Sequence, residues 1–220
     1  MTEEQAKLIL RTQFGVSRET EARLEQFVDL LTVEAQKQNL ISATTVGAIW
    51  SRHILDSAQL LQFLSHTNQT WLDLGSGAGF PGLVIALLSP FKVTLVESRA
   101  RRIDYLRHAV AVLGLPDVTV AGAPLERLET APYSVISARA FAPLPRLFAL
   151  ASRFSTDKTL WLLPKGRNAA KEWMNAQAEW AGDFRIEPSL TDADAGILVG
   201  HLTGKRCVRA SRAGTRHEKR

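Results

Sequence analysis

The chain has 220 residues, 45% hydrophobic and 22% charged, a composition that supports a buried core and excludes global disorder. Its formal net charge is +5, and its single cysteine, Cys207, excludes an intrachain disulfide and a cysteine-rich zinc site, so we expect no metal. No apolar run reaches the roughly 18 residues that would cross a membrane, and the acidic residues 1–5 lack the apolar stretch of a secretory signal, so we expect a cytoplasmic protein.

Residues 1–66 are predicted to be helical. Ser17 is a suitable N-cap, with Glu19 and Glu21 in the first turn of a helix, and the apolar residues that follow repeat at helical spacing. Residues 39–44 interrupt this pattern before a second amphipathic stretch begins.

The second amphipathic stretch covers residues 49–64, and the polar residues 66–69 after it predict a turn. Within the stretch, His53 and Asp56 lie three residues apart and share one face of a helix. They fit either a substrate pocket or a buried packing block that docks these helices on the rest of the chain.

From residue 70 onward, short apolar runs alternate with helical segments. Strands are expected at residues 71–74, 93–96, 118–120, 135–137 and 159–163, and two later ones near 184–186 and 196–202. Helices are expected at residues 83–88, 99–113 and 168–180, with Gly114 just past the end of the second. This alternation predicts an α/β fold with a mostly parallel sheet and helices on both faces.

The first strand runs into a glycine-rich loop at residues 75–82. Glycine permits positive φ and a close approach of the backbone to a ligand. Gly75, Gly77 and Gly79 give G-x-G-x-G, which suits S-adenosylmethionine, whereas Gly77, Gly79 and Gly82 give G-x-G-x-x-G, which suits a dinucleotide.

Two acidic residues bear on this choice. Asp73, at the end of the first strand, would repel a pyrophosphate and favour a ligand that carries an ammonium and a sulfonium. Glu97, at the end of the second strand, can accept hydrogen bonds from ribose hydroxyls, as expected for both cofactors. Because Gly75 also follows the strand directly, the pattern favours S-adenosyl-L-methionine as the cofactor.

The basic residues gather at the C-terminus. Residues 205–220 contain seven basic residues and one acidic residue, Glu218, so the rest of the chain is almost neutral. Such an arm fits a polyanion such as nucleic acid, or a solubilising tail.

Five short blocks together resemble the RsmG (GidB) family of bacterial 16S rRNA guanine-N7 methyltransferases. The resemblance covers roughly residues 24–202, and the blocks are Asn-Leu-Ile-Ser-Ala at 39–43, Arg-His-Ile-Leu-Asp-Ser at 52–57, the loop at 75–82, Arg-Ala-Phe at 139–141 and Leu-Pro-Lys-Gly at 163–166. It implies a seven-stranded Rossmann-like class I S-adenosylmethionine-dependent methyltransferase that methylates N7 of a guanine in the 530 loop of 16S rRNA, in the cytoplasm and as a monomer. The expected partner is 16S rRNA or the small ribosomal subunit.

The resemblance also implies roles for particular residues. Cofactor contacts are expected from the loop and from the ends of the next strands: Asp73, Gly75, Ser76, Gly77, Gly79, Phe80, Glu97, Ser98, Arg99, Leu125, Glu126 and Arg139. Arg139 would align the substrate at the mouth of the site and bind RNA together with Lys165. No residue is assigned as a general base, because N7 of guanine already carries the lone pair that attacks a methyl group.

We therefore expect a helical extension at residues 1–66, a methyltransferase domain at 67–204 and a basic arm at 205–220. Two other functions remain open. The chain could be a non-catalytic RNA- or ribosome-binding module on a methyltransferase fold, or a methyltransferase with a different RNA, protein or small-molecule substrate.

Overall fold

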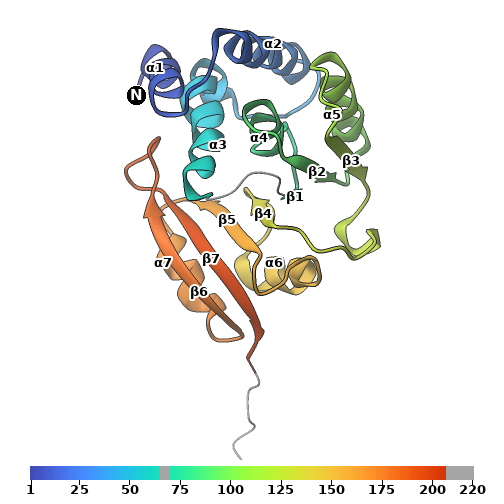
Figure 1. The fold of residues 1–220 in the computed structure, drawn as a ribbon, viewed down its shortest axis with the longest axis vertical. Helices are drawn as coiled ribbons and strands as arrows, with labels where there is room; N and C mark the ends of the chain where they lie inside the picture. The colour runs from blue at the N-terminus through green and yellow to red at the C-terminus, as the bar shows by residue number, and fades with distance from the viewer. Residues whose placement is uncertain (65–69, 207–220) are drawn as a thin grey trace, which may run out of the picture.

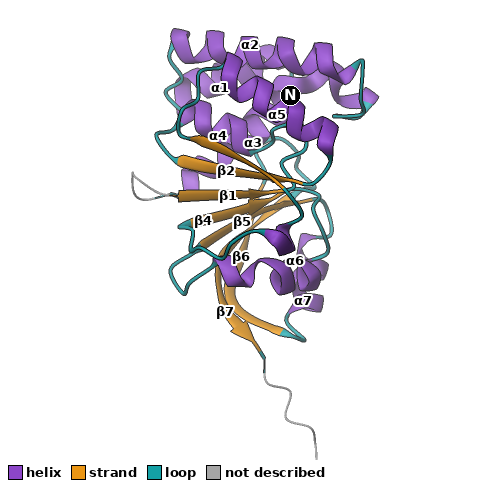
Figure 2. Ribbon diagram, turned by 90° about the vertical axis from the view of Figure 1, so that its right-hand side faces the viewer, coloured by secondary structure: helices purple, strands orange, loops and turns teal. Residues whose placement is uncertain are grey.

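A seven-stranded sheet runs through the molecule and separates two layers of helices in this computed structural model, which describes residues 1–64 and 70–206 (Figure 1 and Figure 2). The strand order is β3-β2-β1-β4-β5-β7-β6, and β7 runs antiparallel to both of its neighbours. The strands are β1 (Thr70–Leu74), β2 (Lys92–Glu97), β3 (Val118–Gly122), β4 (Val135–Ala138), β5 (Leu160–Lys165), β6 (Trp180–Pro188) and β7 (Gly196–Lys205).

Helices cover both faces of the sheet. One layer contains α1 (Glu3–Gln13), α2 (Arg18–Ala35), α3 (Asp56–Ala58), α4 (Gly82–Leu88) and α5 (Ala100–Val112), and the other contains α6 (Leu144–Ala151) and α7 (Ala169–Ala176) (Figure 2). A π-helix, η2 (Trp50–Leu55), and short 3-10 helices complete the chain: η1 (Ala43–Ala48), η3 (Gln59–Phe63), η4 (Leu125–Arg127) and η5 (Ser152–Phe154). Each face of the sheet accordingly has its own apolar cluster.

The N-terminal helices share one core with the sheet. Ser17 caps α2 as predicted, because its side chain accepts a hydrogen bond from the amide of Thr20 at 3.1 Å. Leu24, Phe27 and Leu31 of α2 are fully buried in the same cluster as α4 and β1. The N-terminal helices are therefore part of the main core.

The second amphipathic stretch is not one regular helix but changes from π to α to 3-10 geometry. The carboxylate of Glu3, in the first turn of α1, accepts hydrogen bonds from the amides of Trp50 and Ser51 at 2.8 and 3.0 Å and from the Ser51 hydroxyl at 2.8 Å. These contacts satisfy donors that the start of η2 leaves open.

The structure confirms the predicted strands, and two elements on the α6–α7 side differ from the prediction. Helix α6 was not predicted from the sequence; Pro145 lies in its first turn, where proline is well tolerated. Helix α7 ends at Ala176, and β6 already begins at Trp180, where pairing with Lys205 of β7 outweighs the local helical pattern.

The last strand extends into the predicted basic arm. Lys205 is the last residue of β7, and Arg206 donates from its amide to the Glu179 carbonyl at 2.7 Å and from Nε to the Trp180 carbonyl at 3.2 Å. The fold thus continues two residues past the expected boundary at residue 204. The rest of the predicted arm, residues 207–220, and the predicted turn at 66–69 lie outside the described residues.

Candidate functional site

The glycine-rich loop leaves β1 at the carboxyl edge of the sheet and is attached to the end of β2. Gly75 and Gly77 have φ angles of 70° and 56°, which side chains rarely adopt. The amides of Gly75 and Ser76 donate to the Val96 carbonyl at 2.9 and 3.0 Å. A Cβ on Gly75 would lie 2.7 Å from the ring of Phe141, so this residue must remain small.

Asp73 lies beneath this loop and does not face a cavity. Its carboxylate accepts hydrogen bonds from the Gly82 amide at 3.1 Å and from the Ser137 hydroxyl at 2.7 Å. The side chain is fully buried, and this burial raises the pKa of the carboxyl group. We expected Asp73 to face the cofactor; in the structure it instead satisfies buried partners and holds both ends of the loop together.

Glu97 reaches the loop from the end of β2. One carboxylate oxygen accepts from the Gly77 amide at 3.1 Å, and the other accepts from the amides of Ser98 and Arg99 at 2.8 and 3.0 Å. NH1 of Arg102 lies 3.8 Å from the carboxylate oxygen that accepts from Gly77. Glu97 therefore fixes the loop and, at the same time, lines the cavity beside it.

This cavity, which we call the loop cavity, has a volume of about 400 Å³ and lies where β1, β2, β3 and β4 end. Its volume falls within the range of about 300–1,000 Å³ that is usual for small-molecule sites. Six of the predicted cofactor residues line it: Gly75, Glu97, Ser98, Arg99, Leu125 and Glu126. Ser76 and Phe80 are buried, and neither they nor Gly77 and Gly79 contribute to its lining.

Residues 140–143 form a wall of the loop cavity that the sequence did not assign to the site, although the Arg-Ala-Phe block at 139–141 gave a signal. Ala140 has a φ of 53°, an unusual value for a residue with a side chain. Arg102 and Arg146 also line the cavity and were not assigned to it. Backbone strain such as that at Ala140 is often found at functional sites.

A larger cavity lies on the other side of residues 140–143. This base cavity, as we call it, has a volume of about 940 Å³ and shares those four residues with the loop cavity. Its walls come from the N-terminal helices, from the end of β5 and from the loop between β6 and β7. They include His53, Asp56, Arg139 and Lys165.

Arg139 follows β4 and lies in the wall of the base cavity. Its NH1 lies 3.1 Å from Nδ1 of His53 and 3.5 Å from a carboxylate oxygen of Asp56. The guanidinium lies over the ring of Phe80, 5.1 Å from its centroid, and His53 stacks on the same ring with 4.9 Å between centroids. The structure thus joins Arg139 and Phe80, expected near the cofactor, to the pair His53 and Asp56.

Burial and charge shift the pKa values of His53 and Arg139. Burial, together with the positive charges of Arg139 and Arg52, lowers the pKa of His53 to about 3, so the imidazole is neutral at physiological pH. Burial also lowers the pKa of Arg139, while the carboxylate of Asp56 opposes that shift.

Lys165, at the end of β5, lines the base cavity as part of an ion pair. Its Nζ lies 2.9 Å from a carboxylate oxygen of Glu172 in α7, and only 10% of the lysine side chain is exposed. The sequence analysis assigned Lys165 to RNA binding together with Arg139. The structure places it in the wall of the same cavity as Arg139, where Glu172 holds it.

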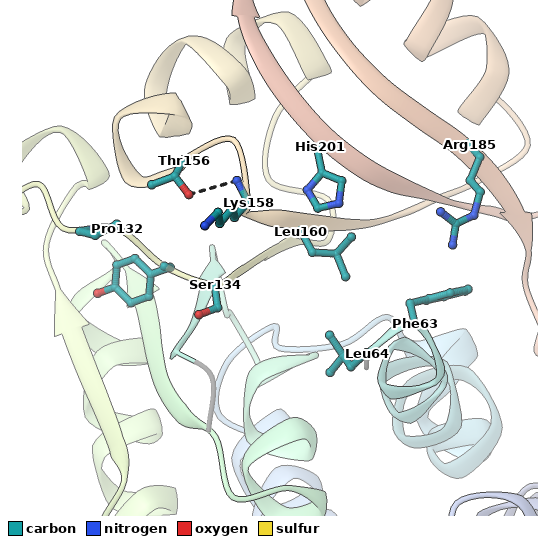
Figure 3. Close-up of a pocket in the computed structure, with 10 residues that line it drawn as sticks. Phe63, Leu64, Pro132, Ser134, Thr156, Lys158, Leu160, Arg185 and His201 are labelled. Atoms are coloured by element: carbon teal, nitrogen blue, oxygen red, sulfur yellow. Dashed lines mark hydrogen bonds between the residues drawn. The ribbon is translucent and has the colours of Figure 1, made fainter. Parts of the chain in front are cut away.

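A third cavity, of about 590 Å³, lies at the opposite edge of the sheet, where β4 and β5 begin. Figure 3 shows Phe63 and Leu64 on one side of it and His201 and Arg185 on the other. None of the residues assigned from the sequence lines this cavity.

Among the residues that the structure describes, no group of three or more His, Cys, Asp or Glu side chains could hold a metal ion. Over the same ranges, 1–64 and 70–206, no helix is long and apolar enough to span a bilayer.

A profile of the GidB family, described as rRNA small subunit methyltransferase G, matches residues 20–195. The chain belongs to this family. It is 54% identical over 202 residues to ribosomal RNA small subunit methyltransferase G of Rhizorhabdus wittichii, which covers 90% of this chain and 92% of that protein. The protein of the same name from Sphingopyxis alaskensis is 56% identical over 192 residues, which covers 87% of this chain and 82% of the relative.

Solved structures with lower sequence identity share the fold. A variant of MtNAS in complex with S-adenosylmethionine superposes with a TM-score of 0.56 at 17% identity, covering 92% of this chain and 84% of the other. A SAM-dependent methyltransferase from Aquifex aeolicus also gives 0.56, at 14% identity, covering 78% of this chain and 97% of the other. The expected Rossmann-like class I methyltransferase fold is therefore confirmed.

Proposed function

We propose that this member of the GidB family transfers a methyl group from S-adenosyl-L-methionine to N7 of a guanine in the 530 loop of 16S rRNA. One observation carries the proposal: two cavities meet at residues 140–143, one lined by six of the predicted cofactor residues and the other by Arg139 and Lys165. Because both cavities share these residues, reactants bound in the two cavities would lie next to each other at this segment. The relatives named rRNA small subunit methyltransferase G support the RNA substrate.

The residues of the loop cavity fit the cofactor. Glu97 has a carboxylate on the cavity wall for ribose hydroxyls, and the adjacent Ser98 and Arg99 extend that wall. Leu125 and Glu126, in η4, offer an apolar and a polar contact where this fold places the adenine. The backbone of Gly75 lines the cavity and is available to the methionine end, and a Cβ at this position would meet Phe141.

The proposed reaction needs alignment more than proton transfer. When bound, the cofactor supplies an electrophilic methyl group on a positively charged sulfur. The lone pair of guanine N7 forms the new bond as the sulfur–methyl bond breaks, so the positive charge moves from sulfur to the purine and no proton has to leave. Arg139 and Asp56, which line the base cavity, offer hydrogen-bonding groups that would hold the base in that geometry.

Positively charged side chains that suit an RNA substrate line both cavities. Arg139 and Lys165 line the base cavity, and Arg99, Arg102 and Arg146 line the loop cavity. Positive side chains at the mouth attract the phosphate backbone, whereas contacts to the base decide which nucleotide enters. We propose that the protein acts as a cytoplasmic monomer on 16S rRNA or the small ribosomal subunit.

The decisive experiment follows methyl transfer from labelled cofactor to three substrates: small-subunit particles, protein-free 16S rRNA and the same RNA with the target guanine replaced by adenine. We expect label at N7 of one guanine, and no label in the replaced RNA. Cofactor binding without transfer to any RNA would instead favour a non-catalytic module, and transfer to another acceptor would redefine the substrate.

Arg139→Ala tests the assignment within the base cavity. We expect transfer to fall roughly 100-fold, the scale for a misaligned reactant, while the affinity for the cofactor is unchanged. Arg185→Ala, at the opposite edge of the sheet, is the matched control and should keep full turnover. Equal turnover in the two variants would refute the role of Arg139.

A further inference from the structure

His53 is held in a single orientation by partners at both ring nitrogens. Nδ1 faces NH1 of Arg139 at 3.1 Å, and Nε2 faces the hydroxyl of Thr45 at 3.0 Å. The ring stacks on Phe80, with 18° between the two planes, and only 8% of the residue is exposed. Each ring nitrogen of His53 therefore has one defined hydrogen-bonding partner.

The partners also decide which nitrogen carries the proton. A guanidinium has only donors, so the Arg139 contact requires Nδ1 to be the acceptor. The proton of the neutral ring therefore lies on Nε2, which donates to Thr45. The result is a lone pair that is aimed at Arg139 from the N-terminal helices.

Arg139 depends on that lone pair for its orientation. The hydrogen bonds that it makes within the described residues all use NH1: to His53 at 3.1 Å, and to Asp56 and the Arg52 carbonyl at 3.5 Å. The two longer contacts lie at the limit of hydrogen-bond distance, so His53 provides the best-defined one. Nε and NH2 are left for a ligand in the base cavity, which Arg139 lines.

We propose that His53 is a positioning residue, whose Nδ1 lone pair orients Arg139 toward the target base. The inference rests on the proposed function for the role of Arg139, and it adds a residue of the N-terminal helices to the site. Neither proton transfer nor direct contact with the reacting atoms is assigned to His53. A neutral imidazole suits this position, because a protonated ring would repel the guanidinium of Arg139.

Two substitutions test the effect of the Nδ1 lone pair separately from the effect of the aromatic ring of His53. His53→Asn places an amide oxygen near the position of Nδ1, whereas His53→Phe keeps an aromatic ring on Phe80 and removes the acceptor. We expect His53→Phe to lower kcat for RNA methylation by roughly 10- to 100-fold, and His53→Asn to recover most of the loss. Cofactor affinity should be unchanged in both, and His108→Asn, at an exposed site in α5, should retain full turnover.

A spectroscopic measurement on the wild-type protein needs no turnover. The nitrogen-15 chemical shifts of His53 should report an unprotonated Nδ1 and a protonated Nε2, and Arg139→Ala should shift the Nδ1 signal. A protonated Nδ1, full turnover in His53→Phe, or equal losses in His53→Phe and in a folded His53→Asn would each overturn the inference. Failure of the wild type to methylate RNA would refute the proposed function instead, and the shifts would still test the hydrogen bond.

Discussion

At the residue scale, the side chains that shape the loop and those that face a ligand are partly the same. Glu97 holds three backbone amides and also lines the loop cavity. Asp73, although adjacent in sequence to the loop, only supports it from below. Substitutions of these residues therefore change the shape of the cavity as well as its chemistry.

Gly77→Val should abolish cofactor binding without unfolding the protein. The φ of 56° would cost a side-chain-bearing residue about 1–2 kcal/mol, and Cβ would lie 3.4 Å from NH1 of Arg102. Calorimetric titration with the cofactor and thermal melting would measure both effects. Gly114→Val is the matched control, because its φ is 59°, its Cβ would meet nothing within 4 Å, and it lies outside the glycine-rich loop. Equal cofactor affinity in the two variants would contradict the assignment of the loop.

Glu97→Ala should weaken cofactor binding by about 1–3 kcal/mol, the scale for a hydrogen bond to a charged group. Part of this effect would come from the Gly77 amide, which no longer has its acceptor. Titration of the variant against the exposed control Glu129→Ala would measure it. If the two proteins bind the cofactor equally well, the ribose is held by other residues.

His53 should make stability fall at acidic pH. Its folded-state pKa of about 3 lies below the ordinary value of 6.5, so the unfolded chain binds a proton that the folded chain excludes. The stabilisation is complete above the ordinary pKa and is lost as pH falls toward about 3, by up to about 1.4 kcal/mol for each pH unit. Denaturant unfolding between about pH 4 and pH 6 should therefore show a steeper pH dependence in the wild type than in His53→Asn. Parallel curves would mean that His53 titrates normally.

At the element scale, the π-helix η2 connects the N-terminus to the site. It carries Arg52 and His53 toward the base cavity, and its first amides are bound by Glu3 of α1. The loop between β6 and β7 packs against η2 and the start of α3, because Arg52 pairs with Asp192 at 3.0 Å and the Thr191 hydroxyl donates to Asp56 at 2.8 Å. Elements from both ends of the chain thus determine one wall of the cavity.

Glu3→Ala should destabilise the contact between α1 and η2. The variant leaves two amides and a hydroxyl of η2 without their acceptor, which should lower the free energy of unfolding by about 1–2 kcal/mol, by analogy with a helix cap. Because η2 carries His53, we also expect slower RNA methylation at unchanged cofactor affinity. Glu4→Ala, in the same helical turn but exposed, provides the comparison for both melting and turnover. Identical behaviour of the two variants would show that α1 does not influence the site.

At the scale of the whole molecule, charge is distributed unevenly along the chain. Residues 207–220 contain five basic residues and one acidic residue. Lys205 and Arg206 belong to the folded hairpin, so a truncation after Arg206 keeps the hydrogen bonds that join β7 to its neighbours.

Deletion of residues 207–220 should weaken RNA binding and flatten its dependence on salt, because fewer counterions are released when the complex forms. The slope of log affinity against log salt concentration should become shallower by about 0.7–0.9 for each phosphate that the protein no longer neutralises. Cofactor affinity and the melting temperature should remain those of the full chain. An unchanged slope would identify the arm as a solubilising tail.

Local patterns along the chain were enough to predict the architecture, because the period of apolar residues and the positions of glycine are properties of short segments. The alternation from residue 70 onward predicted the sheet and its two helical layers, and Gly75 to Gly79 located the loop. Glu97 and Leu125, which the sequence placed near one ligand, do lie in the wall of one cavity, since parallel strands end at a common edge.

What each polar side chain faces became clear only from the packing of the whole chain. Nothing in the sequence separates Asp73, which is buried beneath the loop, from Glu97, which lines the cavity, because both lie near the end of a buried strand. The sequence also left His53 open between packing and substrate binding; in the fold the ring packs on Phe80 while its lone pair meets Arg139. His53 and Arg139 lie more than eighty positions apart, so their contact depends on how the chain packs and not on any local pattern.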